Sequence, residues 1–289
     1  MHRAILLVIF AAYALAETPL EQQIRAIAAD AAGQVAVACA LPGSALNCHL
    51  NPHAHAPMQS VFKLPLAMAA LDRVERGALA LDQQVRFRPE DRILPKAYSP
   101  LQDKYPAAEV DIPLRELLRL AVSLSDNVAA DLVLRLVGGP AVVEKYVHGL
   151  GIAGFQLKDG EHALHRQDAL QYRNWFEPSA AVQLLRRLSD DPPLSAEHTR
   201  LLLDWMSVGI RSRLSRKLPA KTPVMHKAGT SSTQNGVTAA TNDIGLIVLP
   251  DGRRLAIAIF VTDSHADEAA RESVIAGIAE AVYRECVRQ

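Results

Sequence analysis

Two kinds of hydrophobic periodicity divide this 289-residue chain, and their order along the sequence limits the folds that it can adopt. Alternation of period two predicts strands at 34–41, 45–50, 222–227, 241–249 and 253–262. Spacing of period 3.6 predicts helices at 20–31, 60–76, 114–122, 128–137, 141–150, 178–188, 196–206 and 267–288. Strands therefore lie near both ends of the chain. We predict an α+β fold: one antiparallel five-stranded sheet built from both ends, flanked by helices, with an all-helical lobe inserted.

The same order sets the expected lobe boundaries. An α/β lobe would take about 17–58 and 209–289, and the helical lobe about 59–208. Within the helical lobe, residues 151–175 show neither periodicity and predict a long polar loop. Such loops in compact domains are usually functional or disordered.

The first 16 residues predict a cleaved signal peptide. His2 and Arg3 precede an apolar run at 4–15, and residues 14–16 (Ala-Leu-Ala) match a small-x-small cleavage site. The run is short for a bilayer span, and no cysteine directly follows the cleavage site. We therefore expect a mature domain at 17–289 that is secreted to the periplasm without stable membrane association. A buried helix or a retained anchor is the alternative.

The charged residues, cysteines and histidines of the chain indicate which partners, disulfides and metal sites to expect. The 31 basic and 31 acidic residues cancel, so no nucleic-acid partner is expected. Cys39 and Cys48 flank a turn at 42–44 and either form a disulfide or remain two packed thiols, with Cys286 left over. No metal site is expected from the histidine-rich stretch, because no carboxylate or cysteine accompanies its histidines. These are His49, His53 and His55.

Ser60-Val-Phe-Lys63 places a hydroxyl and an amine three residues apart at the start of a predicted helix. Residues at this spacing share one face of a helix. A serine alcohol needs a neighbouring base to become nucleophilic, and a lysine amine can be that base where burial lowers its pKa. Taken alone, the pair could equally be an exposed lysine near a helix cap.

Two further motifs follow in order. Ser125-Asp-Asn127 separates two predicted helices, where a helix N-cap is the plain interpretation. His226-Lys-Ala-Gly-Thr-Ser231 ends a predicted strand. There Lys227 and the hydroxyls could hold an anionic substrate, and Gly229 allows a ligand to approach the backbone; a protective edge lysine is the alternative. Each motif is weak alone, but the ordered set is specific.

On these three motifs the chain resembles the class A serine β-lactamases over nearly its whole mature length. Three supporting segments are 57–59 (Pro-Met-Gln), 77–82 (Gly-Ala-Leu-Ala-Leu-Asp) and 241–243 (Thr-Asn-Asp). The resemblance implies hydrolysis of β-lactam antibiotics, both penicillins and cephalosporins, through a serine acyl-enzyme, which gives antibiotic resistance. It also implies a monomer that needs no cofactor and takes a small β-lactam as its partner.

Release of the acyl-enzyme requires a base that activates water. In the family this base is a glutamate of the long loop after the S-D-N motif. Glu161 lies at about the usual separation and is our prediction, with Glu177 of a Trp-Phe-Glu-Pro segment as the alternative. His165 stands where the family usually has asparagine, and with 171–175 it resembles an extended-spectrum, cephalosporin-favouring branch. We expect His165 to hold the water or the loop, or simply to be packed or solvated.

The substrate-binding strand departs from the family at Ala228. The family usually has Ser or Thr there, and the missing hydroxyl removes a hydrogen bond worth about 0.5–1.5 kcal/mol. Lys227, Thr230 and Arg213 are expected to compensate, with activity weakened or shifted in spectrum. The resemblance places the backbone N–H of Thr230 in an oxyanion hole and Tyr98 in an aromatic wall of the cleft. Arg213 and Tyr98 could otherwise be ordinary surface residues.

The resemblance implies the remaining roles. Ser60 attacks the lactam carbonyl and loses its proton to Lys63, or through water to Glu161. Ser125 relays a proton to the leaving nitrogen, and Asn127 orients the substrate amide. Three other functions stay open: a penicillin-binding D,D-peptidase, another amide or ester hydrolase of the same fold, and a non-catalytic secreted binding domain.

Overall fold

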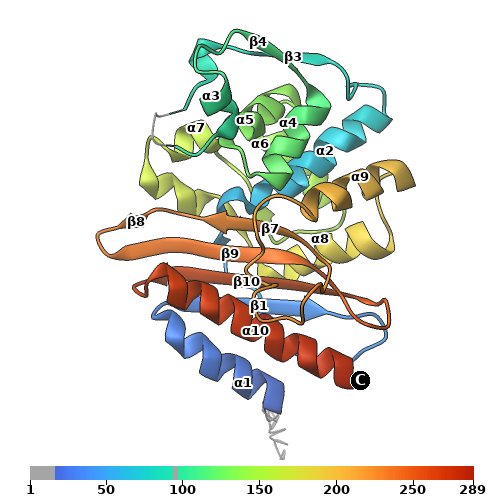
Figure 1. Ribbon diagram of the computed structural model, residues 1–289, viewed down its shortest axis with the longest axis vertical. Helices are drawn as coiled ribbons and strands as arrows, with labels where there is room; N and C mark the ends of the chain where they lie inside the picture. The colour runs from blue at the N-terminus through green and yellow to red at the C-terminus, as the bar shows by residue number, and fades with distance from the viewer. Residues whose placement is uncertain (1–16, 94–96) are drawn as a thin grey trace, which may run out of the picture.

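The computed structural model describes residues 17–93 and 97–289, and it confirms the α+β architecture (Figure 1). The predicted signal peptide at 1–16 lies outside the described residues. An antiparallel five-stranded sheet has the order β1-β10-β9-β7, with β8 paired to β9. Its strands are β1 (Gln34–Ala40), β7 (Val224–Thr230), β8 (Thr233–Gln234), β9 (Val237–Val248) and β10 (Arg254–Ser264).

Helices lie on both faces of this sheet. The terminal helices α1 and α10 lie side by side against one face, and α8 packs against β1 and β10 from the other (Figure 1). The α-helices are α1 (Pro19–Ala28), α2 (Lys63–Glu75), α3 (Pro100–Lys104), α4 (Leu114–Ser123), α5 (Asn127–Leu136), α6 (Pro140–Gly149), α7 (Glu161–Leu164), α8 (Pro178–Asp190), α9 (Ala196–Met206) and α10 (Glu268–Arg288).

Shorter elements fill the connections between them. The short strands are β2 (Ala56–Pro57), β3 (Gln84–Phe87), β4 (Val110–Pro113), β5 (Phe155–Gln156) and β6 (Trp175–Phe176). The 3₁₀ turns are η1 (Ala29–Ala31), η2 (Gln59–Phe62), η3 (Pro89–Asp91) and η4 (Asp168–Arg173). Strands β2, β5 and β6 form a small sheet that joins the chain before η2 to both ends of the 154–177 region.

Strand β10 shows how the period-two pattern builds two cores. Ile257 and Ile259 are buried in the core beneath α1 and α10, whereas Ala258 and Phe260 are buried in the core that includes the helices from the middle of the chain. Successive side chains of a strand point to opposite faces. A central strand covered on both faces must therefore be apolar throughout.

The predicted strand at 45–50 is wrong. There, one bridge joins Leu50 to Val37 of β1, and the fifth strand of the sheet is β8 instead. The side chains of Ser44 and Asn47 accept hydrogen bonds from the backbone N–H groups of Leu46 and His49, at 3.0 and 3.2 Å. Such local side-chain bonds compete with a strand ladder, so this segment does not extend the pairing.

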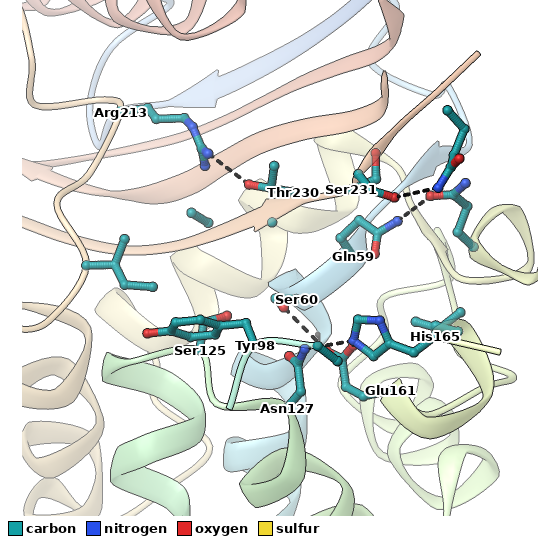
Figure 2. Close-up of a pocket in the computed structure, with 18 residues that line it drawn as sticks. Gln59, Ser60, Tyr98, Ser125, Asn127, Glu161, His165, Arg213, Thr230 and Ser231 are labelled. Atoms are coloured by element: carbon teal, nitrogen blue, oxygen red, sulfur yellow. Dashed lines mark hydrogen bonds and ion pairs between the residues drawn. The ribbon is translucent and has the colours of Figure 1, made fainter. Parts of the chain in front are cut away.

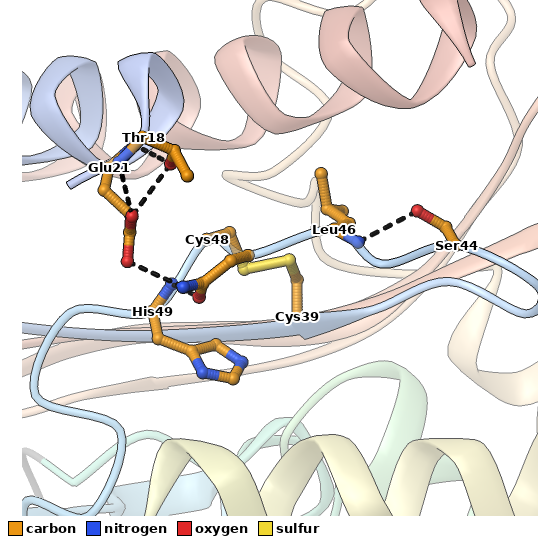
Figure 3. Close-up of a disulfide and its surroundings, with 8 residues drawn as sticks. Thr18, Glu21, Cys39, Ser44, Leu46, Cys48 and His49 are labelled. Carbon is orange, nitrogen blue, oxygen red and sulfur yellow. Dashed lines mark hydrogen bonds between the residues drawn. A yellow bond between two sulfur atoms is a disulfide. The ribbon is translucent and has the colours of Figure 1, made fainter. Parts of the chain in front are cut away.

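The 41–51 segment instead covers the free edge of β1. Leu50 exchanges backbone hydrogen bonds with Val37, and the Asn51 side chain donates to the carbonyl of Val35 at 2.9 Å. A disulfide joins Cys39 to Cys48 between these two elements (Figure 3). Three anchors at alternate residues of β1 thus protect an edge that could otherwise pair with another chain. The third cysteine, Cys286, is buried with a free thiol.

Within the described residues, no helix combines the length and the apolar character that crossing a membrane requires.

Replacing both Cys39 and Cys48 by serine should lower the free energy of unfolding by about 2–3 kcal/mol, the entropy of a closed loop of about ten residues. Urea unfolding of the oxidised protein and the double variant would measure the difference. Reductant should destabilise the wild type and leave the variant unchanged. Equal midpoints for the wild type with and without reductant would contradict a stabilising disulfide.

Candidate active site

Ser60 lies in the 3₁₀ turn η2, which leads directly into α2. The turn begins at Gln59, whose backbone has a φ of 47°, a value uncommon for a residue with a side chain. Strand β7 passes so close that a Cβ added to Gly229 would lie 2.5 Å from the carbonyl oxygen of Met58 and 3.3 Å from the amide nitrogen of Ser60. A side chain at that position would push the serine turn away from the strand.

The Lys63 side chain is fully buried and surrounded by oxygen atoms. Its Nζ donates to Oγ of Ser60 at 2.9 Å, to the carbonyl of Ser125 at 2.8 Å and to Oδ1 of Asn127. Oε1 of Glu161 lies 2.9 Å from the same nitrogen. Buried charges need partners of this kind, and here the partners come from three separate segments: η2, the 125–127 stretch and α7.

Asp126 fixes the turn that carries Ser125. It is fully buried and caps α5 by accepting the N–H of Ala129 at 2.9 Å. Its carboxylate also accepts the hydroxyl of Ser99 at 2.9 Å and the N–H of Leu101 at 2.6 Å. The predicted N-cap is therefore present, and the residue that forms it is Asp126. The preceding residue, Ser125, has a left-handed backbone conformation with φ of 57°.

Lys227 contacts the side chain of Ser125, whereas Lys63 contacts its backbone carbonyl. Its Nζ donates to Oγ of Ser125 at 2.9 Å and to the carbonyl of Ala228 at 2.9 Å. Burial, followed by the nearby Lys63 ammonium, holds the pKa of Lys227 well below its usual value. The Ser125 hydroxyl thus accepts a hydrogen bond from a buried amine, an arrangement suited to passing a proton.

Glu161 begins α7, and its carboxylate faces Ser60. Ser60 Oγ donates to Oε1 of Glu161 at 3.3 Å. Asp131 of α5 holds this helix by accepting the backbone N–H groups of Glu161 and His162 at 2.8 and 2.7 Å. Burial and the Glu161 carboxylate raise the pKa of Asp131 to about 6. Nε2 of His165 lies 2.9 Å from Nδ2 of Asn127 and 3.7 Å from Oε2 of Glu161.

The largely buried side chain of Arg213 extends to Thr230 at the end of β7. Its Nη2 donates to Oγ1 of Thr230 at 2.8 Å, and its Nη1 donates to the carbonyl of Asn242 at 3.2 Å. Its Nε donates to Glu272 at 3.0 Å, and this carboxylate also pairs with Arg216. A guanidinium held on several sides is well placed to attract a carboxylate at the end of β7.

These groups surround one cleft of about 530 Å³ (Figure 2). Lys63 and Lys227 are buried beside it. All of the other residues predicted for the site line it: Ser60, Tyr98, Ser125, Asn127, Glu161, His165, Arg213, Ala228, Gly229 and Thr230.

Glu177, the alternative base, is not among the cleft residues. Its carboxylate lies 2.9 Å from Nδ1 of His53 and 3.6 Å from Nε2 of His55. His55 in turn stacks on Trp175 at 3.7 Å between ring centroids. In the part of the chain that the structure describes, no cluster of three or more His, Cys, Asp or Glu side chains is arranged to hold a metal ion.

Comparison with known proteins identifies the family. The sequence model of the β-lactamase enzyme family matches residues 19–286. The chain belongs to this family. It is 39% identical to the extended-spectrum β-lactamase PER-1 of Pseudomonas aeruginosa, over 93% of this chain and 88% of that protein. A β-lactamase from Chitinophaga pinensis is similar in structure, with a TM-score of 0.89 and 42% identity over 93% of this chain and all of the other.

A representative class A β-lactamase from Bacteroides cellulosilyticus is also similar. Its structure gives a TM-score of 0.85 at 32% identity, over 93% of this chain and 98% of that chain. The resemblance drawn from the three sequence motifs is therefore confirmed at the level of family and fold. The chain is a class A β-lactamase, a hydrolase of β-lactams.

Sequence reasoning missed several residues of the β-lactamase cleft. Nε2 of Gln59 donates to Oε1 of Gln171 at 2.7 Å and so links the serine turn to η4 (Figure 2). Both residues lie in segments that carry the resemblance, but a sequence gives no distance between them. The remaining unpredicted lining residues are Ala97, Leu164, Ile210, Ser232 and Gln234, and Ser231 of the Lys227 motif also lines the cleft.

Gly229→Ala should lower kcat/KM for a chromogenic cephalosporin by about 100-fold, because the new Cβ displaces the serine turn, and misplacement by about 1 Å costs that much. Gly149→Ala is the matched control: a Cβ there meets nothing within 4 Å. It should keep full activity. Unchanged kinetics in Gly229→Ala would show that β7 does not hold the serine turn in place.

Asp131→Asn should change how stability depends on pH. The folded-state pKa of Asp131, about 6, exceeds its usual 3.8, so its contribution to stability is full below about pH 4 and is lost as pH rises through about 6. The unfolding free energy of the wild type relative to the variant should therefore fall by up to about 3 kcal/mol between pH 4 and 7. Urea unfolding at one-unit pH steps would show this, whereas a pH-independent difference would contradict it.

Proposed function

We propose that this β-lactamase opens the lactam ring on Ser60 and releases the product with the help of Glu161. One observation carries the proposal. The Ser60 hydroxyl contacts both the Lys63 ammonium at 2.9 Å and the Glu161 carboxylate at 3.3 Å, and it faces a cleft large enough for a small ligand. A nucleophile beside a base, in a cleft, is the arrangement that acyl transfer requires.

In acylation, Oγ of Ser60 attacks the lactam carbonyl carbon, and the C–N bond breaks. The serine proton leaves to Lys63, once that amine has given up a proton, or through a water to Glu161. Both are within reach of the hydroxyl. The ring nitrogen receives a proton that Ser125 relays: the serine hydroxyl gives its proton to the nitrogen and takes one from Lys227, which donates a hydrogen bond to it.

The developing oxyanion would be stabilised by the backbone N–H groups of Ser60 and Thr230. The close approach of Gly229 to the serine turn supports this assignment, because it brings the end of β7 beside η2. Preorganised N–H donors of this kind typically contribute about 3–4 kcal/mol each to catalysis.

In deacylation, Glu161 removes a proton from a water that attacks the acyl carbon. The ester bond to Oγ of Ser60 then breaks, and Glu161 returns the proton to that oxygen, which lies within reach of its carboxylate. Asp131 supports this role by fixing the backbone at Glu161. His165 contacts both Asn127 and the glutamate, so we assign it to holding Asn127 and the α7 region together. Asn127 would then bind the amide of the substrate side chain.

The substrate carboxylate would bind at the end of β7. The hydroxyls of Ser125 and Thr230 and the charges of Lys227 and Arg213 converge there. Ala228 lines the same wall without a hydroxyl. The Arg213–Thr230 hydrogen bond supports Thr230 as the group that replaces the missing contact.

The substrate range is proposed to include extended-spectrum cephalosporins. PER-1, an extended-spectrum enzyme by name, is 39% identical to the chain over the matched region. The amide side chains of Gln59, Gln171 and Gln234 also line the cleft, where they can form hydrogen bonds to polar substituents of a substrate. We also propose a periplasmic monomer released from the signal peptide at 1–16, with lobes at 17–58 plus 209–289 and at 59–208. The Cys39–Cys48 disulfide supports an oxidising compartment.

A penicillin-binding D,D-peptidase would acylate on Ser60 and keep the adduct. The position of Glu161 favours turnover, because a carboxylate at 3.3 Å from the serine can activate water there.

Glu161→Ala should leave acylation detectable and stall release, so that a cephalosporin adduct on Ser60 accumulates. Intact mass against time, with lactam absorbance followed in parallel, would measure both steps. Glu177→Ala is the matched control and should turn over like the wild type, and Ser60→Ala should form no adduct. A stalled adduct in Glu177→Ala instead would transfer the role to Glu177. Full turnover by Ser60→Ala would contradict the proposed acyl-enzyme mechanism.

A further inference from the structure

A buried histidine between β7 and β9 has an acceptor at each ring nitrogen. Nδ1 of His226 lies 2.8 Å from Oδ1 of Asp243, and Nε2 lies 2.8 Å from the carbonyl oxygen of Ile210. A neutral imidazole has one ring N–H and can satisfy one of these acceptors. Donation to both requires the imidazolium form.

The partner carboxylate also holds the chain that follows Ile210. Asp243 is fully buried. Its Oδ2 accepts the hydroxyl of Ser212 at 2.8 Å and the N–H groups of Arg213 and Leu214 at 2.7 and 3.2 Å. Hydrogen bonds from His226 and Asp243 therefore hold residues 210–214 at both ends.

The 210–214 segment forms part of the cleft. Ile210 and Arg213 both line it, and Arg213 donates to Thr230. Figure 2 shows the Arg213 side chain extending from the segment to the end of β7. The backbone N–H of Ile210 also donates to the carbonyl of Ser123 at 3.1 Å, two residues before the Ser125 turn.

We propose that His226 is a positioning residue of the β-lactam site: as an imidazolium it ties Asp243 to Ile210 and thereby holds Arg213 where the substrate carboxylate binds. The inference rests on the proposed function. Loss of the Nε2 proton would leave a lone pair facing the carbonyl of Ile210, which repels it, while Asp243 keeps the proton on Nδ1.

Two charged groups act on His226, and a third acts on its partner. Asp243 lies on β9 and Lys227 is the next residue of β7, whereas Arg213 of the 210–214 segment acts on Asp243. Burial and Lys227 lower the pKa of His226, but the Asp243 carboxylate and the two hydrogen bonds outweigh them and raise it above its usual 6.5. The imidazolium contacts are therefore complete below about pH 6.5 and are lost as pH rises through the folded-state pKa. KM for a β-lactam should rise over that range.

The first test observes the histidine directly in the wild type. Long-range ¹H–¹⁵N spectra of the ¹⁵N-histidine-labelled protein, assigned by the peak missing in His226→Asn, should show two protonated ring nitrogens at pH 6.5 and loss of the Nε2 proton at higher pH. A neutral ring at pH 6.5 overturns the proposal. This result does not depend on turnover, so it stays distinct from a failure of the proposed function, which would appear as a wild type without lactam hydrolysis.

The second test separates positioning from general stability. His226→Asn should raise KM for a cephalosporin about three- to tenfold with kcat within about twofold, since the lost contacts serve binding, and should flatten the alkaline rise of KM. His198→Asn, which removes a His–Glu75 pair outside the cleft, should change neither constant.

The Arg213→Ala background tests the route of the effect. If His226 acts through Arg213, His226→Asn should change KM less than about twofold there. An equal factor in both backgrounds, or a fall in kcat at constant KM, would overturn the assignment. If His226→Asn does not fold, the wild-type pH dependence of KM, absent in Arg213→Ala, decides in its place.

Discussion

The buried charge of Lys63 is the constraint on which the rest of the site depends. An ammonium removed from water costs several kcal/mol unless oxygen atoms replace its hydration. Ser60, Ser125, Asn127 and Glu161 supply those atoms here. They belong to η2, to the 125–127 stretch that leads into α5, and to α7, so satisfying one charge brings three distant segments of sequence to one point. Ser60 and Glu161 are neighbours because both contact the same cation.

The motifs predicted much of this from sequence, because their chemistry depends on local spacing. Ser60 and Lys63 lie three residues apart, and Asp126 caps α5 as its residue type suggests. Helix α9 was predicted with the observed bounds at 196–206. Period-two alternation likewise placed β1, β9 and β10, with ends shifted by a few residues.

Contacts between distant side chains could not be predicted in the same way. The strand expected at 45–50 fails because Ser44 and Asn47 bond their own backbone, and alternation alone cannot show that competition. The Gln59–Gln171 link joins residues whose separation only the folded chain sets. The choice between Glu161 and Glu177 also needed spatial placement, since both are plausible by composition and one of them faces His53 instead of the serine.

The sheet joins the two ends of the chain, and this has a consequence for how the protein is made. Strand β1 pairs with β10, with Gln34 opposite Thr262. An N-terminal strand that leaves the ribosome early therefore has no partner until almost the whole chain has followed. Contacts so distant in sequence carry a large loop-closure entropy and slow folding. A chain cut short before β10 would leave a hydrogen-bonding edge of β1 without its partner strand, so the sheet cannot be completed until nearly all of the chain has been made.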